Sequence, residues 1–191
     1  MVQPRGRARE QTILLSVITL LDEVGYERLS IDAVAAAARA SKATIYGRWP
    51  DKATLVAAAL RARSEGHPTM TPGAGLRDDL IAFVALAVVL ADAESLPAFV
   101  SVLLASEDEP VLSRAVRETA LQGQRHHCRE IARRAVARGE LTDESAAGTI
   151  FDLVMGRVLV RYIVERSAFP QDDQIAFVDD VLLPVLRPDR A

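Results

Sequence analysis

One stretch of the sequence, residues 30–60, constrains the fold more than any other. It contains three short helical patterns separated by tight breaks. Ser30 is a favourable N-cap for the first pattern, and Ser41 is a favourable N-cap for the second. A turn of three to four residues lies between these two patterns, which is the spacing of a helix-turn-helix. The stretch therefore predicts a helix-turn-helix that binds DNA.

The second pattern has two different faces. Ile45 and Trp49 lie four residues apart and point to one side of a helix, as core residues usually do. The other side is small, basic and able to form hydrogen bonds. Small residues allow close approach to a major groove, and Lys42 and Arg48 offer donors to phosphate or guanine. This side is expected to face DNA.

A third helix is expected to begin after Pro50, with Asp51 as its N-cap. Lys52 stands at its amino end, where the side-chain charge and the helix dipole both favour a phosphate. The candidate DNA-binding residues of the whole stretch are Ser30, Ser41, Lys42, Ala43, Thr44, Tyr46, Gly47, Arg48 and Lys52.

These residues resemble a known family, the TetR family of transcriptional repressors. The resemblance covers about the first third of the chain and rests on Arg9, Gly25 and Tyr26, Ser30 and Ile31, Val34 and Ala35, residues 41–46, Trp49 and Pro50, and Lys52. It implies an all-α homodimer with a small DNA-binding domain, and a larger domain that binds a small molecule and then releases the double-stranded DNA operator. It also implies that residues 41–48, apart from Ile45, and Lys52 contact the groove and the phosphates.

Two positions depart from the pattern of that family. Arg39 stands where a turn glycine is common, so a positive φ at Arg39 would cost on the order of 1 kcal/mol. Gly47 stands where a larger, often basic or aromatic, residue is usual. One DNA contact is therefore expected to be absent at Gly47, and the operator sequence cannot be taken from relatives.

Charge is distributed unevenly along the chain. Residues 1–66 carry ten Lys and Arg against seven Asp and Glu, and the remainder carries thirteen against nineteen, so the two parts have net charges of +3 and −6 within a total of −3. A basic head on an acidic body is expected to hold DNA at one end. Hydrophobic residues make up 50% of the chain and β-branched runs are scarce, which favours a packed all-α fold.

Cys128 is the single cysteine, which excludes an intrachain disulfide and fits a reducing compartment. The longest apolar run, residues 80–91, is too short to span a bilayer, and the amino terminus has no apolar signal core. These features predict a cytoplasmic protein that does not contact a membrane.

The amino terminus is expected to be a flexible arm over residues 1–8. Its Arg5 and Arg7 either enter a minor groove or belong to a disordered tail. A helix over residues 9–24 is expected to end at Gly25. Two prolines and two glycines in residues 67–75 predict a boundary between a DNA-binding domain, residues 1–66, and a ligand-binding and dimerisation domain, residues 67–191.

Apolar spacing predicts five further helices, about nine in all, over residues 76–91, 96–106, 108–138, 143–166 and 172–186. The last two have broad apolar faces. They are expected to form a four-helix interface around a two-fold axis, and the alternative is that both only complete the core of one chain. The expected interface residues are Ile150, Val154, Val158, Val178, Val181, Leu182 and Val185.

A pocket for a largely apolar effector is expected among the first four of these helices, where apolar walls mix with a few polar groups. Its candidate residues are Phe83, Phe99, Leu103, His127, Met155 and Tyr162. Each of them is alternatively a plain core residue.

A metal site or an enzyme is the rival interpretation, because His126, His127, Cys128 and Glu130 form the only cluster of reactive side chains. Adjacent residues of a helix point about 100° apart, and two ligands on one face do not make a site. We therefore expect no enzyme activity, no metal and no cofactor. A helical interaction module that never touches DNA is a further alternative, which a DNA-shift assay would separate.

Overall fold

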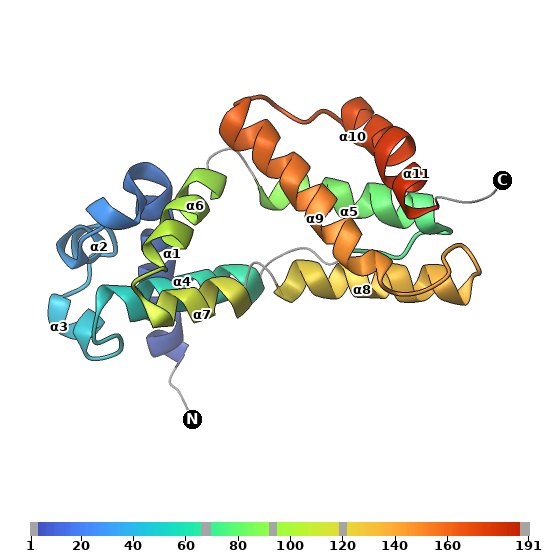
Figure 1. The fold of residues 1–191 in the computed structure, drawn as a ribbon. Coiled ribbons are helices and arrows are strands. Elements are labelled where there is room, and N and C mark those ends of the chain that lie inside the picture. Colours follow the sequence, from blue (N-terminus) through green and yellow to red (C-terminus); the bar gives the residue numbers. More distant parts are fainter. Residues whose placement is uncertain (1–3, 66–69, 92–94, 119–121, 188–191) are drawn as a thin grey trace. The chain divides into compact units, whose positions relative to one another are not determined.

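The structure is a computed structural model that describes residues 4–65, 70–91, 95–118 and 122–187. Every regular element in these ranges is a helix, which confirms the predicted all-α class (Figure 1). The α-helices are α1 (Pro4–Arg28), α2 (Ile31–Ala37), α3 (Lys42–Tyr46), α4 (Lys52–Glu65), α5 (Leu76–Leu90), α6 (Ser95–Ala105), α7 (Pro110–Val116), α8 (Gln122–Ala137), α9 (Ala146–Leu159), α10 (Gln171–Phe177) and α11 (Leu183–Leu186).

The chain forms two compact units. The first comprises Met1–His67 and Pro97–Leu121, and the second comprises Pro68–Leu96 and Gln122–Ala191. The first unit reaches close to the expected boundary at residue 66, but it also contains α7 and most of α6, which we expected in the second domain. They join it because Val102, Leu112 and Val116 are buried in the same core as residues of α1 and α4.

Apolar residues at helical spacing build the core of the first unit. α1 packs against α2 and α4, and α4 packs against α7. Val17 of α1, Val34 of α2, Ile45 of α3 and Leu55 of α4 are fully buried. Burying each such side chain stabilises the folded state by about 1.5–3 kcal/mol. Core packing therefore holds α2 and α3, which are too short to be stable alone.

α1 differs from the prediction at both ends. It begins at Pro4, so the expected flexible arm is wrong for residues 4–8, and residues 1–3 lie outside the described residues. Proline suits the first helical position because its φ is already helical and its missing N–H is not needed there. Gly25, with φ 74° and ψ 172°, interrupts the helix where we expected it to end, and one more turn continues to Arg28.

α5 is the central helix of the second unit and contacts α8, α9 and α10. The predicted helix over residues 108–138 corresponds to α7 and α8, and residues 119–121 between them lie outside the described residues. Leu112 is buried in the first unit and Ile131 in the second, so the two helices serve different cores.

Each of the last two predicted helices contains a π-helical turn. α9 continues as the turn Val160–Val164, and the turn Val178–Leu182 joins α10 to α11. Pro184 explains the second turn, because it has no N–H to donate and its ring would clash with the carbonyl four residues earlier. The helix is therefore wider in the turn before Pro184, where the Leu183 amide donates to the carbonyl of Val178, five residues earlier.

Candidate nucleic-acid interface

Side-chain caps begin the helices around the predicted helix-turn-helix. The Ser30 hydroxyl accepts from the Ala33 amide at 3.2 Å, and the Ser41 hydroxyl accepts from the Thr44 amide at 3.1 Å. Before α4, the Asp51 carboxylate accepts from the Thr54 amide at 2.7 Å. All three predicted caps are therefore confirmed. Each satisfies an amide that a helix leaves without an internal partner.

The turn between α2 and α3 contains a residue in the left-handed region. Arg39 has φ 49°. This is the positive φ that we considered because glycine is common at this position in the family. The Arg39 amide donates to the Ala36 carbonyl at 3.1 Å, and the Ala40 amide donates to the Ala35 carbonyl at 2.8 Å. This pair of bonds is the Schellman ending of a helix, which normally places glycine at the position of Arg39.

α3 and the residues that follow it, up to Trp49, present one side to the core and the other side to solvent. Ile45 is fully buried and Trp49 is 5% exposed, as predicted. The Tyr46 side chain is 49% exposed. The other exposed residues of this surface are Ser41, Lys42, Ala43, Thr44, Gly47 and Arg48. The structure therefore brings the candidate residues of α3 together on one accessible surface.

Two cations on this surface form ion pairs within the first unit. Lys42 pairs with Asp32 in the first turn of α2, and Arg48 pairs with Glu10 of α1. All four side chains remain solvent-accessible, so both pairs are weak and can exchange partners. A phosphate that approaches either cation therefore meets a carboxylate that already lies beside it.

Lys52 is placed differently from the other candidates. Its ammonium group donates to the carbonyl of Tyr26 at 3.1 Å and to that of Glu27 at 3.5 Å, and it lies 4.2 Å from the centroid of the Tyr26 ring. Burial, with the negative charges of Glu109, Glu27 and Asp51, raises the pKa of Tyr26 to about 12. An ammonium group has three donors, so a phosphate contact by Lys52 is compatible with this arrangement and stays a prediction.

The remaining predicted DNA contacts lie outside α3. Arg7 is exposed on α1, whereas the side chain of Arg5 lies outside the described residues. Ser30 is exposed, and its hydroxyl oxygen accepts the α2 cap bond, so its proton can still be donated to a phosphate.

The predicted dimer residues divide into two groups. Ile150, Val154, Val158, Val178 and Leu182 are at most 1% exposed in the single chain. Their assignment to an interface is wrong, because side chains buried in their own unit have no surface to offer. Val181 and Val185 are 38% and 50% exposed. Core and interface residues have the same apolar character, so sequence spacing alone did not separate them.

The six predicted pocket residues do not all belong to one unit. Phe99 and Leu103 lie in the first unit, and Phe83, His127, Met155 and Tyr162 lie in the second. Phe83 is fully buried, and its ring centroid is 6.5 Å from that of His127. Burial, then the positive charges of His126 and Arg134, lowers the pKa of His127. A common pocket for these six residues stays a prediction.

The cluster that suggested a metal site is dispersed. Cys128 is fully buried, and burial raises the pKa of its thiol to about 12. Glu130 is paired with Arg133 at 2.9 Å. Among the residues that the structure describes, no three His, Cys, Asp or Glu side chains gather closely enough to hold a metal ion.

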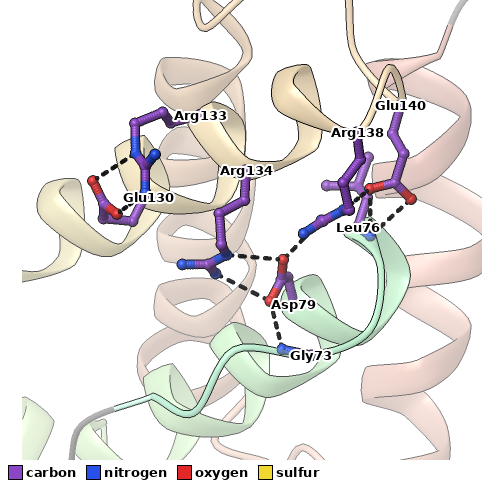
Figure 2. Close-up of polar contacts among 8 residues, drawn as sticks. All are labelled: Gly73, Leu76, Asp79, Glu130, Arg133, Arg134, Arg138 and Glu140. Carbon is purple, nitrogen blue, oxygen red and sulfur yellow. Dashed lines mark hydrogen bonds and ion pairs between the residues drawn. The ribbon is translucent and has the colours of Figure 1, made fainter.

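The second unit contains a buried carboxylate that we did not predict from the sequence. Asp79 of α5 is fully buried and accepts from Arg134 and Arg138 of α8, each at 3.0 Å, and from the Gly73 amide at 2.8 Å (Figure 2). Glu140, just beyond α8, accepts from the Leu76 amide at 3.0 Å. These bonds tie the start of α5 to the end of α8.

Comparison with known proteins agrees with the geometry of the helix-turn-helix. Residues 13–59 match the family described as bacterial regulatory proteins, tetR family, and residues 72–181 match the tetracyclin repressor-like C-terminal domain. The second match alone spans more than half of the chain. This chain belongs to the TetR family. The family recognised from residues 9–52 is therefore confirmed, and the chain is a DNA-binding transcriptional regulator and not an enzyme.

Two relatives of this TetR-family regulator match nearly its whole length. An HTH-type transcriptional regulator of Mycobacterium tuberculosis is 37% identical over 181 residues, which cover 93% of this chain and 88% of the relative. The DNA-binding transcriptional repressor TetR of Mycobacteroides abscessus is 34% identical over 189 residues, 96% of this chain and 97% of the relative. Among solved structures, the flavonoid-responsive regulator FrrA has the same fold, with a TM-score of 0.72, 24% identity, and coverage of 96% and 99%.

Sequence reasoning missed four residues that contact the candidate DNA-binding cations of this TetR-family regulator. They are Glu10, Tyr26, Glu27 and Asp32. Acidic residues are common in the first turn of a helix, so the sequence gives Asp32 no special signal. As for the membrane, no helix among the described residues has both the length and the apolar character needed to cross one.

Proposed function

We propose that this regulator is a ligand-released repressor that binds a pseudo-palindromic operator as a homodimer. The observation that carries the proposal is the exposed surface of α3, with Tyr46, Lys42 and Arg48 around a helix anchored by Ile45 and Trp49. A short helix of this kind fits a major groove, with small residues for close approach and basic residues for phosphate or guanine. Repression agrees with the name of the Mycobacteroides relative.

Dimerisation is proposed through the last helices of the second unit. Their accessible apolar side chains are Leu159, Val160, Val164, Val181 and Val185. α9 also carries Gly148 and Gly156, where an added Cβ atom would meet nothing within 4 Å. Small residues let a second helix approach closely, and exposed apolar surface gains free energy when it is covered. Of the interface residues that we inferred from sequence spacing, this group keeps Val181 and Val185.

The effector is proposed to be a small, largely apolar molecule that binds the second domain. Phe83 and His127 combine an apolar wall with a polar group in the second unit. FrrA, which shares the fold, is named as flavonoid-responsive, and flavonoids are largely aromatic. Release requires that the effector bind better to a form whose two α3 helices are spaced wrongly for successive major grooves.

The test is fluorescence anisotropy of the purified protein with the DNA just upstream of its gene, measured over a salt series. Saturable binding that survives competitor DNA, with a steep loss of affinity as salt rises, is expected because phosphate contacts release counterions. If that fragment is not bound, a genome-wide selection of bound fragments follows, and failure to enrich any sequence would reject the proposal.

A further inference from the structure

The two ion pairs on the α3 surface share one feature. Each joins a candidate DNA-contacting cation to a carboxylate that belongs to a different helix of the same unit. Lys42 and Asp32 are 58% and 66% exposed, and Arg48 and Glu10 are 39% and 36% exposed. Both carboxylates therefore stand at the surface that meets DNA, beside the cations that DNA would use.

The guanidinium group of Arg48 lies beside α1, close to both Glu10 and Gly6. A Cβ atom added to Gly6 would lie 3.7 Å from Nη2 of Arg48. Gly6 and Glu10 are four residues apart on α1 and share one face of that helix. The guanidinium group therefore lies along α1 in the absence of DNA, instead of extending away from the end of α3.

Asp32 has a different setting from Glu10. It lies in the first turn of α2, where the helix dipole stabilises a negative charge. Lys42 is the first residue of α3, so the ion pair spans the turn of the helix-turn-helix. Neither carboxylate is needed as a helix cap, because Ser30 and Ser41 supply the caps.

We propose that Glu10 and Asp32 set the affinity of the regulator for DNA, because each competes with a DNA phosphate for one cation. Arg48 and Lys42 must leave their carboxylates when DNA binds. The carboxylates then face the phosphate backbone without a partner and repel it. The inference rests on the proposed DNA binding by α3, and it adds two acidic residues that weaken this binding.

The salt dependence of binding distinguishes such competition from a structural role. Each phosphate that a cation neutralises contributes about −0.9 to the slope of log K against log salt. A carboxylate left beside the phosphate backbone repels it, and this repulsion is strongest at low salt, where screening is weakest. Glu10 and Asp32 should therefore lower both the affinity and the steepness of the slope. Exposed ion pairs are weak, so these residues tune binding without preventing it.

The experiment uses Glu10→Gln and Asp32→Asn in the full-length protein, because both substitutions keep the side-chain shape and remove the charge. Anisotropy is measured with the selected operator fragment and with an unrelated duplex of equal length, over a salt series. For each variant we expect affinity to rise about 2- to 10-fold at low salt and the slope of log K against log salt to become steeper on both DNAs. The gain should shrink as salt rises.

Glu118→Gln is the matched control. Glu118 forms an exposed ion pair with Arg61, at 3.4 Å, in the same unit. Arg61 lies nine residues after Lys52 on α4, which is about 13 Å along the helix and beyond the Debye length of about 8–10 Å. Between about 0.1 and 0.15 M salt, where this Debye length applies, this variant should bind DNA with the wild-type affinity and slope.

A double substitution separates competition for Arg48 from a general effect of charge. In an Arg48→Gln background, Glu10→Gln should have a much smaller effect, because the cation for which Glu10 competes is gone. An undiminished effect there, or wild-type slopes for both single variants, would overturn the inference and leave the proposed function standing. Failure of the wild-type protein to bind any DNA would overturn both.

Discussion

The ammonium group of Lys52 lies over the ring of Tyr26, 4.2 Å from its centroid, and donates to the Tyr26 carbonyl at 3.1 Å. Tyr26 directly follows Gly25, where α1 is interrupted, and its amide donates to the hydroxyl of Ser101 in α6 at 3.1 Å. One buried tyrosine therefore connects the amino end of α4 with the break in α1 and with α6. All of these elements belong to the first unit, which also carries the helix-turn-helix.

Lys52→Ala tests both roles of this lysine. Loss of the carbonyl contacts and of the cation–π contact should lower the free energy of unfolding by about 1 kcal/mol. Loss of a phosphate contact should weaken operator binding and make the slope of log K against log salt shallower by about 0.9 for each chain of the dimer. Urea denaturation measures the first effect, and anisotropy over a salt series measures the second.

Lys52→Gln is the companion variant, because an amide still donates to the Tyr26 carbonyl but carries no charge. It should lose less stability than Lys52→Ala and show the same shallower slope. If both variants keep the wild-type slope, Lys52 serves only to hold Tyr26.

Tyr46→Ala should weaken operator binding without unfolding the protein. Because Tyr46 is 49% exposed, its removal should change the free energy of unfolding by no more than about 0.5 kcal/mol. A hydrogen bond to a charged phosphate contributes about 1.5–3 kcal/mol, so we expect a loss of about tenfold or more in affinity.

Tyr46→Phe isolates the hydroxyl group and should reproduce most of the loss. Ile45→Ala, on the buried side of the same helix, should instead lower stability by about 2–5 kcal/mol. Operator affinity equal to that of wild type in both Tyr46→Ala and Lys52→Ala would refute the assignment of DNA binding to this surface.

Arg39→Gly should stabilise the protein. Arg39 and Gly139 occupy the same position in equivalent helix endings, with φ 49° and φ 70°. A side chain at such a φ lowers stability by about 1 kcal/mol. Replacing it with glycine removes this strain, but glycine loses more conformational entropy on folding, which offsets part of the gain. We expect a gain of about 0.5–1 kcal/mol in thermal or urea denaturation. The contact of Arg9 with the Arg39 carbonyl uses the backbone and is retained.

Gly139→Ala provides the opposite substitution at the matching site. An added Cβ there meets nothing within 4 Å, so the expected loss of about 1 kcal/mol comes from the backbone conformation alone. Equal stability of Arg39→Gly and wild type would mean that the arginine side chain compensates for its own strain.

Local features of the first unit could be predicted because they depend on neighbouring residues. Ser30, Ser41 and Asp51 cap helices that begin directly after them, and the strained Arg39 was recognisable from its place in the turn. The ion pair of Arg48 with Glu10 joins residues 38 apart, and the contact of Lys52 with Tyr26 joins residues 26 apart. Such contacts form only when the helices pack together, so no local sequence pattern predicts them.

The second unit shows a different limit of sequence reasoning. Apolar residues such as Val154 and Val185 have the same character, yet one is buried in its own unit and the other is half exposed. Spacing predicted an apolar face on each helix, but how much of that face is covered depends on how the neighbouring helices pack against it. The π-helical turn before Pro184 also rotates the residues beyond it, which shifts the faces of α11 away from regular helical spacing.

Asp79 should make stability depend on pH. Burial alone raises the pKa of its carboxyl, but bonds from the Gly73 amide, Arg134 and Arg138 outweigh burial and hold this pKa below its ordinary value of about 3.9. The unfolded state therefore binds more protons in this range. The contribution to stability is complete above about pH 4 to 5 and is lost as the pH falls through the native pKa.

Asp79→Asn should remove this dependence and lower the free energy of unfolding at pH 7 by about 3–5 kcal/mol, because two arginines lose their buried partner. Urea denaturation between pH 7 and pH 3 measures both quantities. Asp78→Asn, on the exposed side of the same helical turn, should retain the wild-type dependence. If Asp79→Asn loses as much stability on acidification as wild type, other carboxylates account for the acid sensitivity.

Val185→Asp should convert the proposed dimer to monomers. Val185 is 50% exposed on α11, and Val164, beyond α9, is 74% exposed, so a charge at either position removes apolar contact from a partner without disturbing the core of the chain. Burying an unpaired carboxylate in an apolar interface costs several kcal/mol, which is enough to dissociate a dimer at micromolar concentration. Light scattering after size exclusion measures the mass.

Leu15→Asp is the control. Leu15 is 67% exposed on α1 of the first unit, so this substitution should leave the mass unchanged. A dimer that survives both Val164→Asp and Val185→Asp would place the interface on another surface. Monomeric Val185→Asp that still binds the operator as tightly as wild type would instead show that DNA recognition does not require two chains.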